Sequence, residues 1–351
     1  MIQSIIDKTM EYLSVPAVVG HEQLFMDFLE SDYKKCKLSV YKHERYIVVS
    51  GAEPQSAIIS AHIDRHGLIS LGNDEYVYAA QYLKEIKYGV NNRLAQEQVQ
   101  SIAERFDGEH IYAYDPATGE KLGQGKIETC NPCIQSGDAI FFVQDMDKIS
   151  HGIPLAYART ARHVDDYLKG QIDNALSLGV VYELFRQGFK GTAILTTEEE
   201  IGKSWIHIQA YLEQEKIETK NLIILDTSPF TDEEPIKQGH LILRNRDMSE
   251  IFNTDLVQAL KVRAEELGLV YQVKDEAMIA SGKTVEQLGS TELGRLVQGT
   301  QGRWNGATIQ IPTLMYHTSK ETTTTRAIEN YFLFLNDILV QNRLPMLEFE
   351  N

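Results

Sequence analysis

Three consecutive glutamates, at positions 198–200, lie just beyond a short run of small and apolar residues at positions 191–195. Such a run is typical of a strand buried on both faces of an α/β sheet. Ligands of these sheets bind beyond the carboxyl ends of strands, so the glutamates are predicted to border a crevice. Apolar residues at helical spacing over 201–212 also place the acids near a helix N-terminus, where negative charge is favoured. Because three adjacent carboxylates repel one another, we expect cations beside them.

The composition is that of a globular protein. The chain has 351 residues, 43% of them hydrophobic, which is enough for one large domain and a smaller one. The formal charge is −16 and no basic stripe is present, which argues against nucleic acid or an anionic membrane as a partner. No stretch reaches the roughly 18 apolar residues of a membrane helix, and the first residues lack the layout of a signal peptide. We therefore expect a cytoplasmic protein.

Two of the three cysteines, Cys130 and Cys133, have the C-x-x-C spacing of a redox pair or of half a zinc knuckle. There is no second pair to complete a structural zinc site, and Cys36 stands alone. We expect ordinary thiols in a reducing compartment.

The first part of the chain predicts two helices and then two strands. The helices lie within positions 1–35 and are separated by a break at Pro16 and Gly20. The strands lie at 46–50 and 56–64. Because side chains alternate along a strand, His62 and Asp64 at the end of the second strand face the same side.

From about position 67 to 164, short strand-like pieces and turns replace the long apolar runs. A hairpin that turns at 115–119 and a strand at 137–143 are predicted here, with one helix at 91–106. We therefore predict a small inserted β domain at 67–164, within a main domain formed by residues 1–66 and 165–351.

Three more polar side chains lie at a helix start or beyond a strand. Asp173 opens a helix predicted over 170–185, where on its own it would be read as an N-cap. Asp226 ends a strand at 221–228, and His317 follows a strand at 307–311. The remaining predicted elements are strands at 241–243 and 270–273, and helices at 249–267 and 325–341.

Because each lies at a strand end or helix start, five of these side chains are expected to converge: His62, Asp173, Glu200, Asp226 and His317. Two imidazoles and three carboxylates suit divalent zinc, cobalt or manganese, and their number suits two ions. Such ions can polarise a carbonyl oxygen and activate water. Asp64 is placed to accept the second N–H of His62, and Glu199 is free to accept a proton from the water.

These motifs resemble metallopeptidase family forty-two, the tetrahedral, glutamyl and deblocking aminopeptidases, some of which are described as endoglucanases. The resemblance covers nearly the whole chain. Its Ala-His-x-Asp motif resembles Ala61-His62-Ile63-Asp64, and its Asp-Asp-Arg helix start resembles Asp173-Asn174-Ala175. The remaining matches are Glu199-Glu200-Ile201-Gly202, the strand-end Asp226, Gly289-Ser290-Thr291-Glu292, and Tyr316-His317 with Glu321.

The resemblance implies an α/β fold of the phosphorylase/hydrolase type found in zinc aminopeptidases, with a mixed sheet flanked by helices and a small inserted β domain. It implies that Asp173 bridges two divalent ions, most often zinc, with His62 and Asp226 on the first and Glu200 and His317 on the second. Glu199 would be the general base, and peptides the substrate. A cis peptide bond after Asp173 and a homo-oligomer, from a dimer to a dodecamer, are also implied.

The chain departs from the family pattern at four positions. Arg65 stands where the family usually has Glu, Asn174 and Ala175 replace Asp and Arg, and Glu292 replaces an Asp. We expect Glu292 to border the site. Two alternatives remain open: a related two-metal deacylase, and a non-catalytic assembly protein that uses the inserted domain as its interaction surface. Glycoside hydrolysis fits less well, because it would leave the histidines unexplained.

Overall fold

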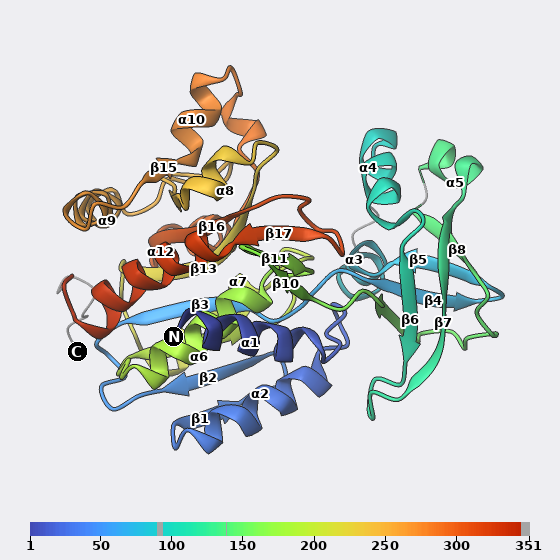
Figure 1. Cartoon of the computed structure of the whole chain (residues 1–351), viewed down its shortest axis with the longest axis horizontal. Helices are drawn as coiled ribbons and strands as arrows, with labels where there is room; N and C mark the ends of the chain where they lie inside the picture. Colours follow the sequence, from blue (N-terminus) through green and yellow to red (C-terminus); the bar gives the residue numbers. More distant parts are fainter. Residues whose placement is uncertain (90–93, 138, 345–351) are drawn as a thin grey trace.

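The computed structural model describes residues 1–89, 94–137 and 139–344. Within them, a mixed sheet forms the centre of the larger body (Figure 1). Its strands are β1 (Ser39–Lys42), β2 (Tyr46–Ser50), β3 (Ile58–His62), β12 (Thr192–Thr196), β13 (Leu222–Pro229), β14 (Leu241–Leu243), β15 (Tyr271–Val273) and β16 (Gly306–Thr313). They are ordered β1-β2-β12-β3-β13-β16-β14-β15. The four strands β12, β3, β13 and β16 run parallel to one another.

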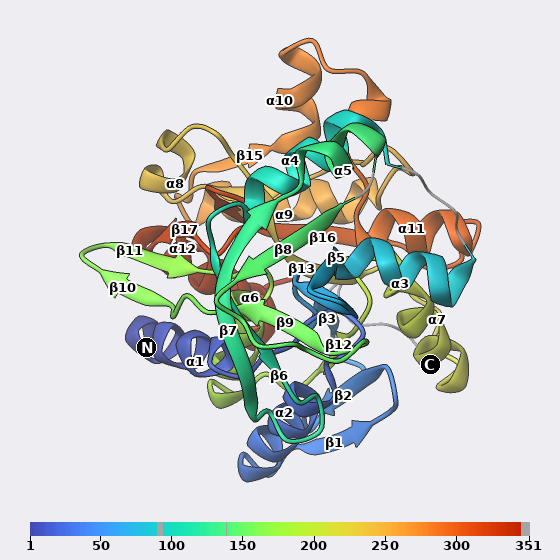
Figure 2. The ribbon, with the colours of Figure 1, turned by 90° about the vertical axis from the view of Figure 1, so that its right-hand side faces the viewer.

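Helices cover both faces of this sheet, as Figure 2 shows from the side. On one face, α6 (Ala175–Arg186) packs on β3 and β13, and α1 (Ile2–Leu13) and α12 (Thr325–Leu335) pack beside it. On the other, α7 (Trp205–Gln214) packs on β12 and α11 (Glu292–Gly299) on β16. The other helices of this body are α2 (Gln23–Lys35), α8 (Glu234–Gln238), α9 (Thr254–Glu266), α10 (Lys274–Ala280), a short 3-10 helix (Val285–Gln287), and a π-helical turn (Asn336–Val340) that continues α12.

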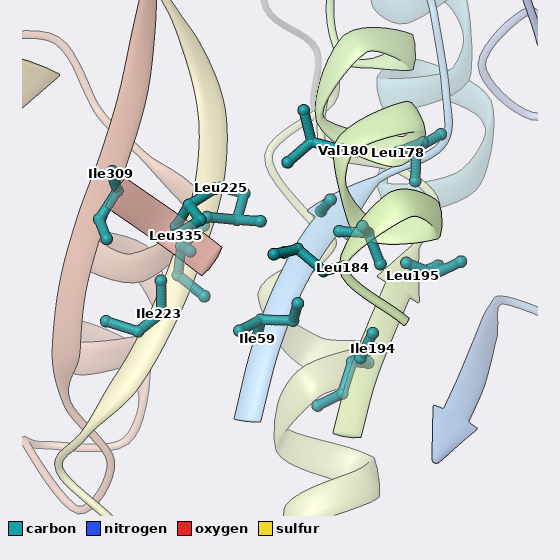
Figure 3. Close-up of a cluster of buried hydrophobic side chains, with 14 of the residues drawn as sticks. Ile59, Leu178, Val180, Leu184, Ile194, Leu195, Ile223, Leu225, Ile309 and Leu335 are labelled. Carbon is teal, nitrogen blue, oxygen red and sulfur yellow. The ribbon is translucent and has the colours of Figure 1, made fainter. Parts of the chain in front are cut away.

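The core lies on both faces of the sheet, and one part of it lies between the sheet and α6. Leu184 of α6 lies over Ile59 of β3 in Figure 3, and Leu178, Leu195 and Leu225 belong to the same apolar cluster; all five side chains are fully buried. Each large apolar side chain buried in this way contributes about 1.5–3 kcal/mol. The central strands are apolar on both faces because helices cover both, as the continuous run at 191–195 predicted.

A closed barrel lies beside the main sheet (Figure 1). Its strands are β4 (Leu68–Gly72), β5 (Glu75–Tyr78), β6 (His110–Tyr114), β7 (Lys121–Thr129), β8 (Ile140–Gln144) and β9 (Pro154–Tyr157), with α3 (Ala79–Tyr88), α4 (Gln96–Phe106) and α5 (Asn131–Ser136) between them. Phe106 stacks on Tyr157 and packs against Phe141 in a separate apolar cluster. All six strands fall within 67–164, the interval for which we predict an inserted domain.

A three-stranded sheet connects the barrel to the site region. It contains β10 (Arg162–Val164), β11 (Tyr167–Gly170) and β17 (Glu321–Thr324), in that order. Gly170 pairs with Glu321 at its end, so the chain entering α6 is held beside the segment that carries His317.

The structure departs from three local expectations. The helix after the glutamates begins only at Trp205, because Glu198 and Gly202 have positive φ angles of 69° and 72° that interrupt a helix. Cys130 and Cys133 form a disulfide instead of two free thiols, because the turn that opens α5 brings their Cα atoms to 5.2 Å. The helix expected at 91–106 spans only Gln96–Phe106 as α4, and positions 91–93 lie outside the described residues.

In the described part of the chain, no helix combines the length and the apolar character needed to cross a membrane.

Candidate active site

Parallel strands bring the predicted residues to one edge of the main sheet. β3, β12, β13 and β16 share a direction, so their carboxyl ends lie together. His62 is the last residue of β3, Glu200 follows β12, Asp226 lies in the second half of β13, and His317 follows β16. Asp173 reaches the same edge from the segment between β11 and α6.

His62, Asp173 and Asp226 form the first group of potential ligands. His62 Nε2 lies 3.2 Å from Asp173 Oδ1 and 3.6 Å from Asp226 Oδ1. Burial lowers the pKa of the His62 imidazole, but its contacts with the two carboxylates outweigh this and raise the pKa well above its usual value. One imidazole and two carboxylates that converge in this way form a donor set suited to a divalent cation.

Glu200, His317 and the unpredicted His66 form the second group. His317 Nε2 lies 3.7 Å from Glu200 Oε2, and His66 Nε2 lies 2.8 Å from the same oxygen. Glu200 and His66 are buried, and the rings of the two histidines pack edge to face with centroids 4.1 Å apart.

Asp173 lies between the two groups. Its Oδ1 faces His62 at 3.2 Å, while its Oδ2 faces His317 Nε2 at 3.4 Å. The peptide bond between Asp173 and Asn174 is cis, which confirms that prediction. The N-cap of α6 is Asn174, so Asp173 is not the cap. Its side chain is directed to the histidines instead.

Glu321 fixes the segments that carry Asp173 and His317. It is fully buried, and its two carboxylate oxygens accept hydrogen bonds from the backbone N–H of Asp173 at 2.8 Å and of His317 at 2.6 Å. One side chain on β17 thus holds two separate pieces of backbone in register.

The second nitrogen of His62 has a different partner from the one predicted. His62 Nδ1 lies 3.1 Å from the backbone carbonyl of Asp64, and 3.7 Å from the nearer carboxylate oxygen of that residue. The Asp64 carboxylate instead accepts hydrogen bonds from the backbone N–H of Glu199 and Glu200, both at 3.0 Å. The prediction was wrong about the accepting atom, because these two amides occupy the carboxylate. Asp64 still fixes the imidazole through its carbonyl and positions the loop with the glutamates.

Glu199 is held by a cation at the edge of the site. Arg295 on α11 donates a hydrogen bond to Glu199 Oε1 at 2.9 Å. Burial raises the pKa of Glu199 to about 8, with a further rise from Asp226 and Asp64 and an opposing effect of Arg295 and His62. Glu199 therefore interacts electrostatically with the first group, and it makes no short contact in either group of potential ligands.

Glu198 faces away from both groups and anchors the loop. Its buried carboxylate accepts hydrogen bonds from Tyr88 at 2.7 Å and from Lys87, and lies 3.1 Å from His207 Nε2. Burial alone raises the pKa of Glu198, but these three partners outweigh it and lower the pKa to about 2. The charge of Glu198 is thus compensated by Lys87, and by Arg45, whose guanidinium lies 3.4 Å from the carboxylate.

The remaining carboxylates and imidazoles fit divalent cations. Burial raises the pKa of Glu200 well above its usual range, and the nearby Asp173 adds to this effect. Burial also raises the pKa of Asp226. Crowded buried carboxylates are unfavourable without cations, and the imidazoles beside them are the nitrogen ligands that zinc and similar metals bind.

The comparison with protein families decides which family this is. The family model described as M42 glutamyl aminopeptidase matches residues 134–333, more than half of the chain. This chain belongs to the M42 peptidase family. It is therefore a peptidase, a metal-dependent aminopeptidase, as the sequence motifs predicted.

The solved structures similar to this M42 peptidase share its fold at low identity. An aminopeptidase from the archaeon Desulfurococcus kamchatkensis has a TM-score of 0.73 and 15% identity, covering 99% of this chain and 97% of that one. The TET1 peptidase of Pyrococcus horikoshii has a TM-score of 0.65 and 16% identity, and the match covers 99% of this chain and 100% of that one. A protein from Thermotoga maritima that is described as an endoglucanase has a TM-score of 0.66 and 12% identity, and the match covers 97% of this chain and 98% of that one. These matches confirm the predicted fold class. A comparison of the sequence with curated proteins finds no match.

Three of the four departures of this M42 peptidase from the family pattern have structural explanations, and Ala175 has none. Arg65 points away from the site, where its guanidinium donates to the carbonyl of Val15 and lies over the Phe25 ring at 5.4 Å. Asn174 donates to the carbonyl of Leu225 at 2.8 Å. Neither side chain adds charge to the potential ligands.

Glu292 does not reach the potential ligands. Its buried carboxylate accepts hydrogen bonds from Ser60 at 3.0 Å and Thr196 at 2.8 Å. These hydroxyls belong to β3 and β12, and Glu292 therefore ties the two strands together beneath the site rather than lining it.

Four residues near the site were missed by the sequence reasoning: His66, Arg105, Arg295 and Glu321. His66 follows His62 by four positions, and this second histidine was a signal in the sequence. Glu321 belongs to one of the matched motifs, but the motif alone assigns it no role. Arg105 lies on α4 of the barrel and Arg295 on α11, and no local pattern marks either residue.

Proposed function

We propose that this M42 peptidase removes N-terminal residues from peptides with two divalent ions, zinc first and cobalt or manganese as alternatives. His62 and Asp226 would hold the first ion, Glu200 and His317 the second, and Asp173 would bridge both. The observation that carries the proposal is the position of Asp173, whose two oxygens face different histidines at 3.2 and 3.4 Å. A single ion would use only one of these groups.

When bound, two divalent ions supply Lewis acidity, which polarises the scissile carbonyl and lowers the pKa of water. In the proposed reaction Glu199 accepts the proton of the attacking water and then donates it to the leaving amine. Arg295 holds Glu199 in place by the hydrogen bond at 2.9 Å. Asp64 supports the same step, because its carboxylate fixes the backbone of both Glu199 and Glu200.

A large cavity beside His317 is the proposed binding place of the substrate. It has a volume of about 1170 Å³ and is lined in part by Phe230, Met278, Met315 and Tyr316. Tyr316 stacks on His317, with ring centroids 3.7 Å apart, so the cavity adjoins the second group of potential ligands. The lining also includes Lys169, Lys274 and Lys283, and its apolar part suits an apolar side chain of the peptide.

The reaction is tested by release of amino acids from short peptides after loading with zinc, cobalt or manganese. The proposal predicts cleavage of peptides with a free N-terminus and no cleavage of the same peptides after N-acetylation. Release of the acyl group would indicate a deacylase instead. Bound metal without turnover of either substrate would indicate a non-catalytic protein.

We also propose a homo-oligomer. The Pyrococcus horikoshii TET1 peptidase is described as assembling into a tetrahedron or an octahedral shell, and a related structure is a dodecamer. Light scattering of the purified protein measures this property. A mass of one chain at micromolar concentration would contradict the proposal.

A further inference from the structure

His66 is placed unlike an ordinary buried histidine. Its side chain is 4% exposed, and Nε2 lies only 2.8 Å from Glu200 Oε2. Despite this distance, no atom of the described residues meets the geometry of a hydrogen bond to that nitrogen. The in-plane direction of Nε2 therefore does not point at the carboxylate oxygen. Two atoms that bind the same metal ion are arranged in this way: they lie close together, but each is directed at the ion and not at the other.

The other ring nitrogen of His66 is already occupied. Nδ1 lies 2.7 Å from the hydroxyl of Tyr78, which is itself buried. If the hydroxyl donated to Nδ1, the proton would sit on Nε2 and lack an acceptor. If Nδ1–H donates to the hydroxyl, Nε2 keeps its lone pair. In the second tautomer Nε2 is free to bind a cation, and metal-binding histidines adopt this tautomer when the other ring nitrogen has a partner.

His317 has the opposite arrangement. Its Nδ1 lies 3.3 Å from a guanidinium nitrogen of Arg105, and arginine can only donate. In this contact Nδ1 accepts, so the proton of a neutral imidazole sits on Nε2, the atom that faces Asp173 and Glu200. His317 must exchange the contact with Arg105 before Nε2 can bind an ion. His66 can adopt the ligand tautomer without losing its partner, because the Tyr78 hydroxyl can accept from Nδ1–H.

We propose that His66 is a ligand of the second divalent ion, together with Glu200, His317 and Asp173. The inference rests on the proposed two-metal function and deepens it. The second position then has two imidazoles and two carboxylates. Because imidazole nitrogen favours zinc and cobalt over magnesium and manganese, the second position is selective for the first pair.

The test is a titration of the metal-free full-length protein with Co²⁺ against a chromophoric chelator, followed by the visible spectrum of bound cobalt. Wild-type protein is expected to bind two ions. His66→Gln is expected to keep the first binding constant and to weaken the second by at least about 100-fold, because losing an outer partner of a ligand already costs 10–100-fold. The cobalt spectrum of the second ion is expected to change in the variant.

Tyr78→Phe and His151→Gln are the companion variants. Tyr78→Phe removes only the partner of Nδ1, and we expect a weakening of the second constant of about 10-fold. His151 is exposed and pairs with Tyr82 in the barrel, so His151→Gln is expected to change neither constant. Circular dichroism of the metal-free proteins reports whether each variant folds.

The outcomes separate the two proposals. Wild-type protein that binds one ion or none would overturn the two-metal function. Two ions in the wild type with an unchanged second constant and spectrum in His66→Gln would overturn the role of His66 alone. If His66→Gln does not fold, a crystal of the zinc-loaded wild type decides. Zinc about 2.0–2.1 Å from His66 Nε2 supports the proposal, and a longer separation refutes it.

Discussion

At the scale of single residues, the site depends on carboxylates that face two partners at once. Asp173 faces His62 with one oxygen and His317 with the other, and Glu321 accepts backbone hydrogen bonds from Asp173 and His317. Glu199 differs, because its short contact is with Arg295, which leaves it available for proton transfer.

Glu199→Gln tests this separation of roles. The amide has nearly the same shape but cannot accept the proton, so we expect kcat to fall by about 10²–10⁴ while metal content stays the same. Peptide cleavage rates and elemental analysis of the same preparation measure both quantities. A variant that keeps wild-type kcat, or that loses its metal, would show that Glu199 is not the general base.

The sequence predicted five convergent residues because each follows a recognisable element. Parallel strands must end at one edge, and an acid or histidine after such a strand can be placed without knowing the fold in detail. His66 and the acceptor of His62 could not be predicted in this way. Both depend on the path of the chain after β3, where a one-residue shift changes which carbonyl or carboxylate faces the ring.

At the scale of elements, the loop after β12 is fastened from two sides. Asp64, beyond β3, holds the backbone of Glu199 and Glu200, while Lys87 and Tyr88 at the end of α3 bind Glu198. The glutamates were predicted to lie at a helix N-terminus, but backbone hydrogen bonds and positive φ angles form a separate loop there. Helical periodicity is a local pattern, so it cannot predict these partners from distant parts of the sequence.

Glu198→Gln should weaken this attachment in a pH-dependent way. The pKa of Glu198 is lowered to about 2 in the folded chain, so its carboxylate stabilises the fold above its unfolded pKa near 4.5. That contribution is lost as pH falls from 4.5 towards 2. We expect the variant to be less stable at pH 7 and to lose less stability than wild type over this acid range. Urea unfolding at several pH values measures the free energy of unfolding of both proteins. If this free energy falls equally in the two proteins between pH 4.5 and pH 2, the expectation is refuted.

Glu321→Gln should loosen the contact between β17 and the start of α6. One of two buried backbone N–H groups loses its acceptor, so we expect a loss of about 1–3 kcal/mol in the free energy of unfolding and weaker metal binding. Glu329→Gln, on the exposed side of α12, is the matched control and should change neither. Equal effects of the two substitutions in chemical denaturation would contradict the role given to Glu321.

At the scale of the whole molecule, ions would join segments that are far apart in the sequence. The proposed ligands come from β3, β13, the loops after β12 and β16, and the segment before α6. Ions that bind only the folded chain stabilise it, by about 2.7 kcal/mol per site at a concentration of 100 Kd. We expect removal of metal by a chelator to lower Tm by at least about 5 °C, and zinc to restore it. Calorimetry measures Tm, and an unchanged value after proven metal loss would count against ions at the proposed position.

The inserted barrel takes part in the same region. Arg105 on α4 contacts His317, and Lys87 and Tyr88 on α3 contact Glu198. The barrel strands lie within the interval in which the sequence texture changes. These contacts could not be predicted, because arginine and lysine side chains carry no pattern that reveals a distant partner.

The metal content of three variants tests the central claim, that Asp173 bridges two ions. Elemental analysis of zinc-loaded protein is expected to give two ions per chain for the wild type and one for Asp226→Ala and for Glu200→Ala. For Asp173→Ala it is expected to give none, because both positions lose a ligand. One ion in the wild type, or the same content in Asp173→Ala as in the other two variants, would contradict the account.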